Sequence, residues 1–81
     1  DASVLDHLSA DDLLECISRL PNGYRTVFNL YAIEGYSHKE IATMLHIQEI
    51  TSRSQFTRAR KTLQEMVQSL ITQDNVSRNR T

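Results

Sequence analysis

Glycine and proline are scarce in this chain, and their placement constrains the fold more than any other feature of the sequence. The 81 residues contain two glycines and one proline, at Pro21, Gly23 and Gly35. An all-β domain needs many turns, and turns depend on these residue types. The sequence therefore predicts an all-α domain, because long stretches contain no residue that breaks a helix.

Two helices are predicted in the first half of the chain. Ser9 is a suitable N-cap, and two aspartates follow it where the helix dipole favours negative charge. A turn is predicted at Pro21-Asn22-Gly23, and a second helix is predicted to follow it and to stop at Gly35. The apolar face of this second helix is marked by residues spaced three and four apart, namely Tyr24, Val27, Phe28 and Tyr31.

Two further helices are predicted in the second half. Ser37 and Glu40 have the spacing of a capping box, which opens a short helix. A turn near residues 46–48 leads to a long helix from Thr51 to about Ile71. The expected organisation is a linker remnant at residues 1–8, one domain at residues 9–71 and a frayed tail at residues 72–81.

Charge is distributed unevenly along the chain, although the net charge is only −1. Residues 1–36 carry six acidic and two basic side chains, whereas residues 37–61 carry five basic and two acidic ones. Phosphate binding depends on local basic surface rather than on the total charge. A nucleic-acid partner therefore stays compatible with this composition. No apolar run approaches the roughly 18 residues of a membrane span, so we expect no membrane partner.

The long helix has two different faces when its residues are projected at about 100° each. The predicted core stripe contains Ser52, Phe56, Ala59, Leu63, Met66, Val67 and Leu70. The opposite face is basic and hydrogen-bonding, and contains Arg53, Ser54, Thr57, Arg58 and Lys61. A short capped helix, a turn and a second helix of this kind are typical of a helix-turn-helix, whose second helix enters the major groove. A basic face on a surface helix is also compatible with simple solvation.

Two segments resemble region 4 of bacterial RNA polymerase sigma factors of the extracytoplasmic-function type. The first is LPNGYRTVFNLYAIEGYSHKEIA, from Leu20 to Ala42, and the second is TSRSQ, from Thr51, followed by Arg58-Ala59-Arg60-Lys61. The resemblance covers roughly residues 9–70. It implies an all-α, four-helix domain with a C-terminal helix-turn-helix of the winged-helix-like sigma region 4 type.

The resemblance also implies a function in the cytoplasm. Such a domain binds the −35 promoter element as double-stranded DNA and docks on core RNA polymerase, chiefly at the β flap. Some relatives are also held by an anti-sigma factor. Carried over to this sequence, the resemblance implies base contacts from Arg53, Ser54, Thr57 and Arg58. The candidates for contact with the DNA backbone are Ser37, Lys39, Arg60 and Lys61.

Three positions depart from the usual pattern of the family. His46 stands at the turn where glycine is common, and histidine adopts a positive φ only at some cost. Gln48 is a poorer helix cap than serine. Ile50 replaces a small residue on the groove-facing side, where it either contacts a thymine methyl or blocks close approach. These departures bear on base selection more than on the fold.

Other chemistry is not expected. The spacing of His7, His38 and His46 fits no zinc pattern, so neither a metal nor another cofactor is predicted. Cys16 is expected to be a packed side chain, and no arrangement of a catalytic nucleophile is present in the sequence. The aromatic residues of the second helix are expected to belong to the core. The chain is therefore predicted not to be an enzyme.

Two alternatives to promoter binding stay open at this point. One is a response-regulator type of helix-turn-helix effector domain, which shares the capped helix but normally dimerises through a further helix. The other is a protein-interaction module that keeps the fold and does not bind DNA. A complete sigma factor also needs region 2, and this chain begins without Met, so we expect a fragment of a longer protein rather than a stand-alone regulator.

Overall fold

The computed structural model describes the backbone of residues 9–79 and the side chains as far as residue 72. This part of the chain contains helices and no strand, which confirms the predicted all-α fold. The predicted linker at residues 1–8 lies outside the described residues. The helices are α2 (Ala10–Ser18), α3 (Asn22–Phe28), α4 (His38–Leu45) and α5 (Glu49–Asn79), and a π-helical segment η1 (Asn29–Ile33) continues α3.

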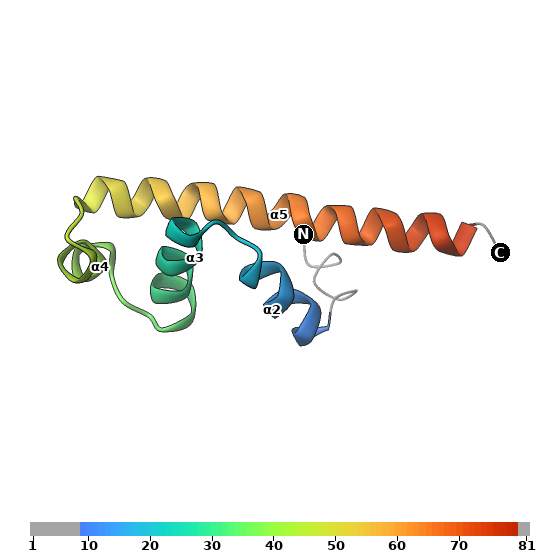
Figure 1. The fold of residues 1–81 in the computed structure, drawn as a ribbon, viewed down its shortest axis with the longest axis horizontal. Coiled ribbons are helices and arrows are strands. Elements are labelled where there is room, and N and C mark those ends of the chain that lie inside the picture. Colours follow the sequence, from blue (N-terminus) through green and yellow to red (C-terminus); the bar gives the residue numbers. More distant parts are fainter. Residues whose placement is uncertain (1–8, 80–81) are drawn as a thin grey trace.

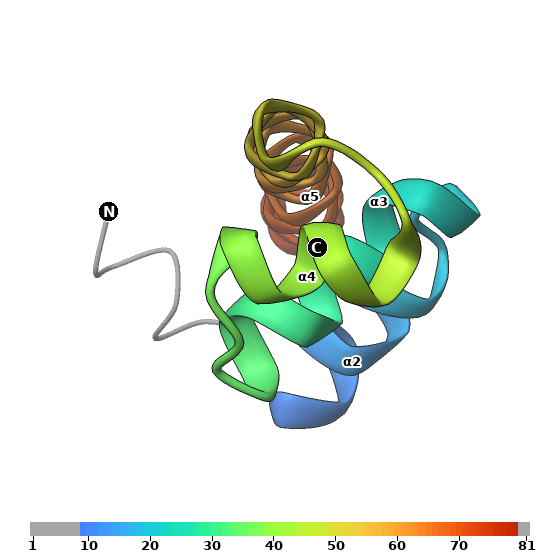
Figure 2. The same cartoon turned by 90° about the vertical axis from the view of Figure 1, so that its left-hand side faces the viewer.

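The three short helices all pack on one side of α5. In Figure 1 they follow one another along α5, with α4 beside its beginning and α2 furthest along it. The view along α5 in Figure 2 shows the same three helices on one side of it. Each of them contacts α5. The opposite side of the first turns of α5 is therefore left uncovered by the rest of the described chain.

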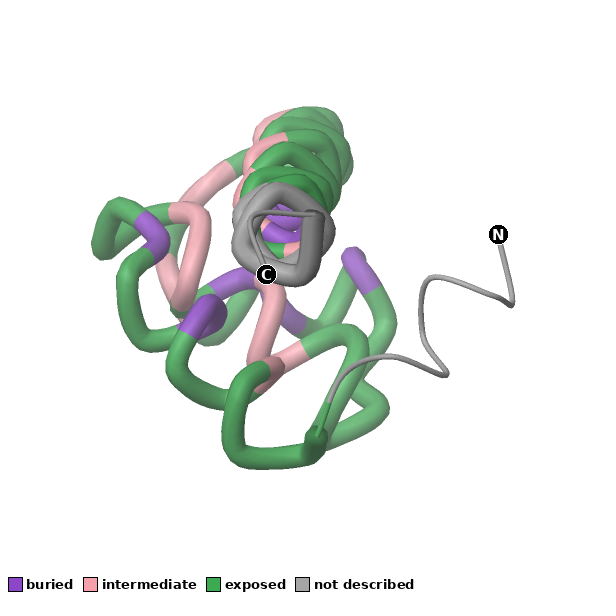
Figure 3. The backbone as a smooth tube through the Cα atoms, turned by 90° about the vertical axis from the view of Figure 1, so that its right-hand side faces the viewer, coloured by how far each residue is buried: buried purple, intermediate pink, exposed green. Residues whose placement is uncertain are grey.

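The main core lies between α2 and the middle of α5. Figure 3 shows the buried positions where the short helices meet α5, with exposed positions on its outer side. Ala59 is fully buried and has a side chain small enough for the helices to approach closely. Cys16 is packed in this core, as expected. The buried cluster consists of Cys16, Ile17, Leu20, Ala59, Leu63 and Val67.

Both predicted helix starts are confirmed by their hydrogen bonds. Ser9 Oγ accepts from the backbone N–H of Asp12 at 3.1 Å, and the Asp12 carboxylate accepts from the N–H of Ser9 at 3.4 Å. Ser37 and Glu40 form the same reciprocal box at the start of α4. Each box satisfies backbone donors that the first turn of a helix otherwise leaves unpaired.

The turn predicted at Pro21-Asn22-Gly23 is wrong in its extent. Only Pro21 precedes the helix, and its carbonyl accepts the N–H of Arg25 at 2.8 Å, so Asn22 and Gly23 already belong to α3. Gly23 lies against α5, since a Cβ at this position would be 3.5 Å from Oε1 of Gln55, which is an ordinary contact distance. Gly35 does terminate the second helical segment, with a φ of 83°.

Helix α5 is longer than the sequence pattern predicts. It begins at Glu49 rather than Thr51, because the N–H of Ser52 already donates to the carbonyl of Gln48. It continues to Asn79 rather than stopping near Ile71. The loss of apolar periodicity after Ile71 suggested an end, but no glycine or proline follows to break the helix. Residues 72–79 of the predicted frayed tail are therefore helical, and residues 80–81 lie outside the described part.

His46 is the residue whose replacement best tests the backbone of the turn. It has a φ of 58° and a ψ of 44°, in the left-handed region that glycine adopts without steric cost. His46→Gly should raise the free energy of unfolding by about 0.5–1 kcal/mol, since the lost strain exceeds the extra freedom of the unfolded chain. His46→Val should lower it. Urea unfolding followed by circular dichroism measures both variants, and a glycine variant less stable than the parent protein would contradict the prediction.

Candidate nucleic-acid interface

Helices α4 and α5 form a helix-turn-helix whose turn is closed by backbone hydrogen bonds. His46 adopts the left-handed conformation, and its N–H donates to the carbonyl of Ala42. The N–H of Ile47 donates to the same carbonyl at 3.0 Å. This arrangement pairs the carbonyl of Ala42 with two donors and turns the chain sharply into α5. The predicted turn at residues 46–48 is confirmed.

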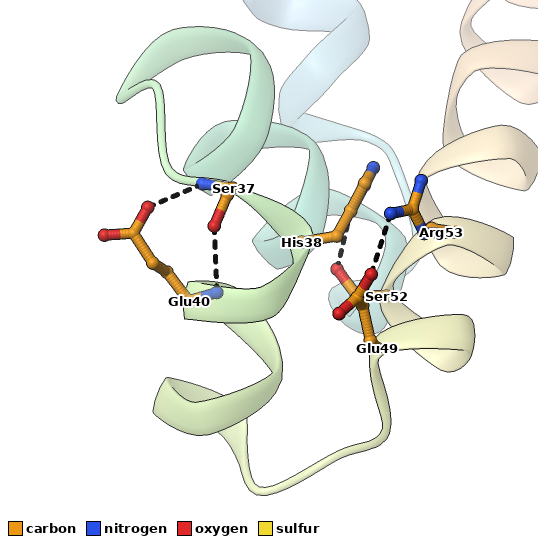
Figure 4. A network of polar contacts seen from close by, with 6 residues as sticks. All are labelled: Ser37, His38, Glu40, Glu49, Ser52 and Arg53. Atoms are coloured by element: carbon orange, nitrogen blue, oxygen red, sulfur yellow. Dashed lines mark hydrogen bonds and ion pairs between the residues drawn. The ribbon is translucent and has the colours of Figure 1, made fainter.

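A buried polar contact joins the starts of the two helices. Nδ1 of His38, the first residue of α4, and Oγ of Ser52, in the first turns of α5, are 2.8 Å apart and hydrogen-bonded (Figure 4). His38 is 8% exposed and Ser52 is fully buried. A hydrogen bond shielded from water in this way fixes the angle between the helices more firmly than an exposed one. It therefore determines how α5 is presented relative to α4.

Aromatic rings surround this contact. The Tyr31 ring stacks on the His38 ring, with centroids 4.1 Å apart and an angle of 8°. Phe56 of α5 lies against both rings, at 4.7 Å from Tyr31 and 5.9 Å from His38, and stacks on Phe28 at 5.7 Å. Tyr31 was predicted to be a core residue, but it is 38% exposed and covers His38. Its position follows from η1, which directs it towards α4.

The environment of His38 favours its neutral form. Burial lowers the pKa of His38, because the charged imidazolium loses its hydration there, and the positive charge of Arg53 lowers it further. The carboxylate of Glu49 opposes this shift. His38 is thus held between α4, α5 and η1 by its contacts with Ser52, Tyr31 and Phe56.

The predicted base-contacting side chains share one exposed face of α5. Arg53, Ser54, Thr57 and Arg58 are all exposed, and none of them lies in the core. Ser54 Oγ donates to the carbonyl of Ile50 at 2.9 Å, and Thr57 Oγ1 donates to that of Arg53 at 3.0 Å. Their oxygen lone pairs stay directed outward as acceptors. Ile50 lies on this face and is 67% exposed.

Glu49 also belongs to this surface, and the sequence interpretation missed it. Its Oε2 accepts from Nη2 of Arg53 at 2.7 Å, and the two side chains are 45% and 62% exposed. This hydrogen bond lowers the pKa of Glu49, and the charges of Arg53, Lys39 and His38 act in the same direction. The available signal was the spacing of an acid four residues before a base, which is typical of an ion pair on a helix.

The side chains predicted to contact the DNA backbone lie in two places. Ser37 and Lys39 stand at the start of α4, whereas Arg60 and Lys61 lie in the fourth turn of α5 and are exposed. Ser37 is already engaged, since its Oγ accepts from the N–H of Glu40 at 3.1 Å and its own N–H donates to Glu40 Oε1 at 2.9 Å. These bonds lower the pKa of Glu40.

An open hollow of about 550 Å³ lies in front of the start of α4. Ser37, His38 and Arg53 line it together with Tyr36. The hollow therefore joins Ser37, which is predicted to contact the DNA backbone, to Arg53, which is predicted to contact a base. The structure brings Ser37 and Arg53 together at the junction of α4 and α5, while Arg60 and Lys61 lie further along α5.

Comparison with known families assigns this fold. The family described as sigma-70, region 4 matches residues 10–63, which include α2, α3, α4 and the first half of α5. The chain belongs to the sigma-70 region 4 family. Region 4 is a DNA-binding regulatory domain and not a catalytic one. A search of curated proteins and a search of solved structures each returned no match.

Two further observations describe this region 4 domain. In residues 9–79, no helix is both long and apolar enough to cross a membrane. Among the side chains of residues 9–72, no group of three or more histidine, cysteine, aspartate or glutamate residues is placed to hold a metal ion.

Region 4 should lose stability on mild acidification through His38. Its ordinary pKa is 6.5 and its pKa in the fold is lower, so the unfolded chain binds the proton first as the pH falls. The stabilising contribution is complete above about pH 6.5 and declines below it. The shifts of Glu40 and Glu49 act only below 4.5, the ordinary value of a glutamate, so the two windows are separate.

Urea midpoints measured between pH 7.5 and 5 test this expectation. The parent protein should show a falling midpoint over this range, and His38→Asn, which does not titrate, should show a smaller fall. Circular dichroism checks that the variant keeps its helices. The same pH dependence in both proteins would show that another group is responsible.

Proposed function

We propose that this domain binds the −35 promoter element in the cytoplasm, as region 4 of an extracytoplasmic-function sigma factor. The observation that carries the proposal is the outer face of α5, which α2, α3 and α4 leave uncovered (Figure 2) and on which the arginine and hydroxyl side chains of Arg53, Ser54, Thr57 and Arg58 are exposed. A helix exposed in this way fits the major groove, where each base pair presents a distinct set of donors and acceptors.

The side chains divide into two roles. Arg53, Ser54, Thr57 and Arg58 would contact base edges, because arginine bonds guanine with two donors and hydroxyls bond several bases. Contacts from Ser37, Lys39, Arg60 and Lys61 to phosphates would fix the position of the domain on the duplex. Lys39 stands beside the capped start of α4, where a helix dipole also favours a phosphate.

The front half of the domain would face protein. Its exposed acidic side chains are Asp11, Asp12, Glu15 and Glu34. Two large apolar side chains are exposed among them, with Leu14 at 57% and Ile33 at 58%. Acidic surface repels DNA, and exposed apolar side chains favour contact with protein. We propose core RNA polymerase, at the β flap, as the partner, and an anti-sigma factor as a second one.

An electrophoretic shift with a −35-like duplex and a salt series tests the proposal. The domain should shift the duplex at low salt and should prefer it to an unrelated duplex. No shift at low salt would favour a protein-interaction module on the same fold. A steep dependence on salt without preference between sequences would show phosphate binding alone.

Two substitutions on α5 should separate the two roles. Lys61→Ala should weaken binding to all duplexes alike and reduce the slope of log K against log salt by about one. Arg58→Ala should instead relax the preference at one base pair, by about five- to a hundredfold. The matched control is Arg19→Ala, because Arg19 is an exposed cation at the C-cap of α2, paired with Glu15 at 3.1 Å. Equal effects of all three variants would contradict the assignment.

Ile50 is expected to select thymine. Its exposed side chain projects from the groove-facing side of α5, and apolar contact is the means by which a side chain detects the methyl group of thymine. Ile50→Gly should therefore reduce the preference for thymine over uracil at one position of the duplex. Competition binding with uracil-substituted duplexes measures this. Unchanged affinity and selectivity in Ile50→Gly would rule out the contact.

A further inference from the structure

An acidic residue lies on the surface that is proposed to face DNA. Glu49 is the first residue of α5, and its side chain is 45% exposed beside Ile50 and Arg53. A carboxylate near phosphates weakens binding to every sequence alike. Its presence at the start of the recognition helix therefore needs a compensating role if the domain reads DNA.

Stabilisation of the helix is one role of Glu49, and it does not account for the whole geometry. An acid in the first turn interacts favourably with the helix dipole and with a base four residues later. An acid and a base that pointed away from the proposed DNA-binding surface would interact with the dipole and with each other equally well. Here the pair includes Arg53, which lines the hollow at the junction of α4 and α5 (Figure 4).

The pair presents complementary groups side by side. Oε2 of Glu49 is bonded to Nη2 of Arg53 at 2.7 Å, whereas Oε1 of Glu49 makes no hydrogen bond within the described residues. The guanidinium has further N–H donors in a planar fork. The bonded ends of the two side chains are 2.7 Å apart, and neighbouring base pairs are about 3.4 Å apart, so the two groups are spaced to reach neighbouring base pairs.

We propose that Glu49 is a specificity-determining residue, and that Glu49 and Arg53 act as one unit that selects a cytosine and a guanine on neighbouring base pairs. The carboxylate accepts from N4 of cytosine, while the guanidinium donates to O6 and N7 of guanine. Adenine is disfavoured opposite Glu49, because its N7 acceptor repels a carboxylate. The inference rests on the proposed binding to promoter DNA and assigns selectivity within that surface.

The ion pair between Glu49 and Arg53 positions the two side chains relative to each other. The short ion pair holds the guanidinium of Arg53 in one orientation before DNA arrives, which reduces the freedom lost on binding. The negative charge of Glu49 lowers affinity for sequences that offer no cytosine amine to it. Glu49 therefore contributes to selectivity through both attraction and repulsion.

Selection of binding sites from a randomised duplex, followed by competition binding, tests the role of Glu49. In Glu49→Gln the preference for cytosine at one position should fall about fivefold, and adenine should become acceptable there because glutamine bonds adenine. Affinity for an unrelated duplex should rise at the same time. Glu65→Gln is the matched control, since Glu65 is another exposed glutamate on α5, about 24 Å further along the helix. It should leave the base preference unchanged.

A double-mutant cycle tests whether the two residues act as one unit. Arg53→Ala should reduce selectivity for guanine strongly in the parent protein and several-fold less in the Glu49→Gln background. Circular dichroism confirms that each variant keeps its helical content. Equal effects of Arg53→Ala in both backgrounds would contradict the coupling.

The outcomes distinguish this inference from the proposed function. If the parent protein selects a sequence and Glu49→Gln selects the same one, Glu49 has no part in selectivity and only this inference fails. If Glu49→Gln and Glu65→Gln raise affinity equally without a change of preference, Glu49 acts by charge alone, which also overturns it. If the parent protein shows no preference between sequences, promoter reading itself fails, and the inference fails with it.

Discussion

The rest of the structure depends on the need of α5 to bury one stripe of its surface. A helix of 31 residues cannot shield its own apolar face, and α2, α3 and α4 each cover part of it. Ala59 and Leu63 are buried by this packing, and the free energy gained by removing apolar side chains from water orders the short helices around them. Because all three lie on one side, the outer face of the early turns stays free. The same packing thus forms the domain and exposes the surface proposed to enter the major groove.

A smaller constraint sets the orientation of that surface. The bond between His38 and Ser52 joins the first residue of α4 to α5, and the rings of Tyr31 and Phe56 enclose it. A buried polar pair is costly when either partner is lost, so it favours one arrangement of the two helices. His46 completes this arrangement by accepting a left-handed backbone at the turn. The angle between α4 and α5 is therefore fixed at two places, at the start of α4 and at the turn.

The sequence was most informative where a local signal has a local cause. The capping boxes at Ser9 and Ser37, the stop at Gly35 and the turn at His46 depend on residues close in the chain, and the structure contains all four. One failure lies at a contact between distant residues. Gly23 was interpreted as part of a turn, whereas it lies in α3 beside Gln55 of α5. The position of that contact does not follow from nearby residues, whereas the extent of α5 beyond Ile71 agrees with the absence of glycine and proline there.

The sequence by itself determined the helices, their caps and the division of α5 into an apolar and a basic face, because these follow from periodicity and from backbone groups that must be satisfied nearby. It also carried the match to sigma-70 region 4. Only the tertiary structure decided that Tyr31 covers His38 instead of joining the core, and that Ser52 on the apolar stripe pairs with a histidine fourteen residues earlier. It also placed the ion pair of Glu49 and Arg53 beside the hollow at the start of α4. These features depend on where side chains from separate helices meet, and burial of the shared stripe on α5 is what fixes those meeting points.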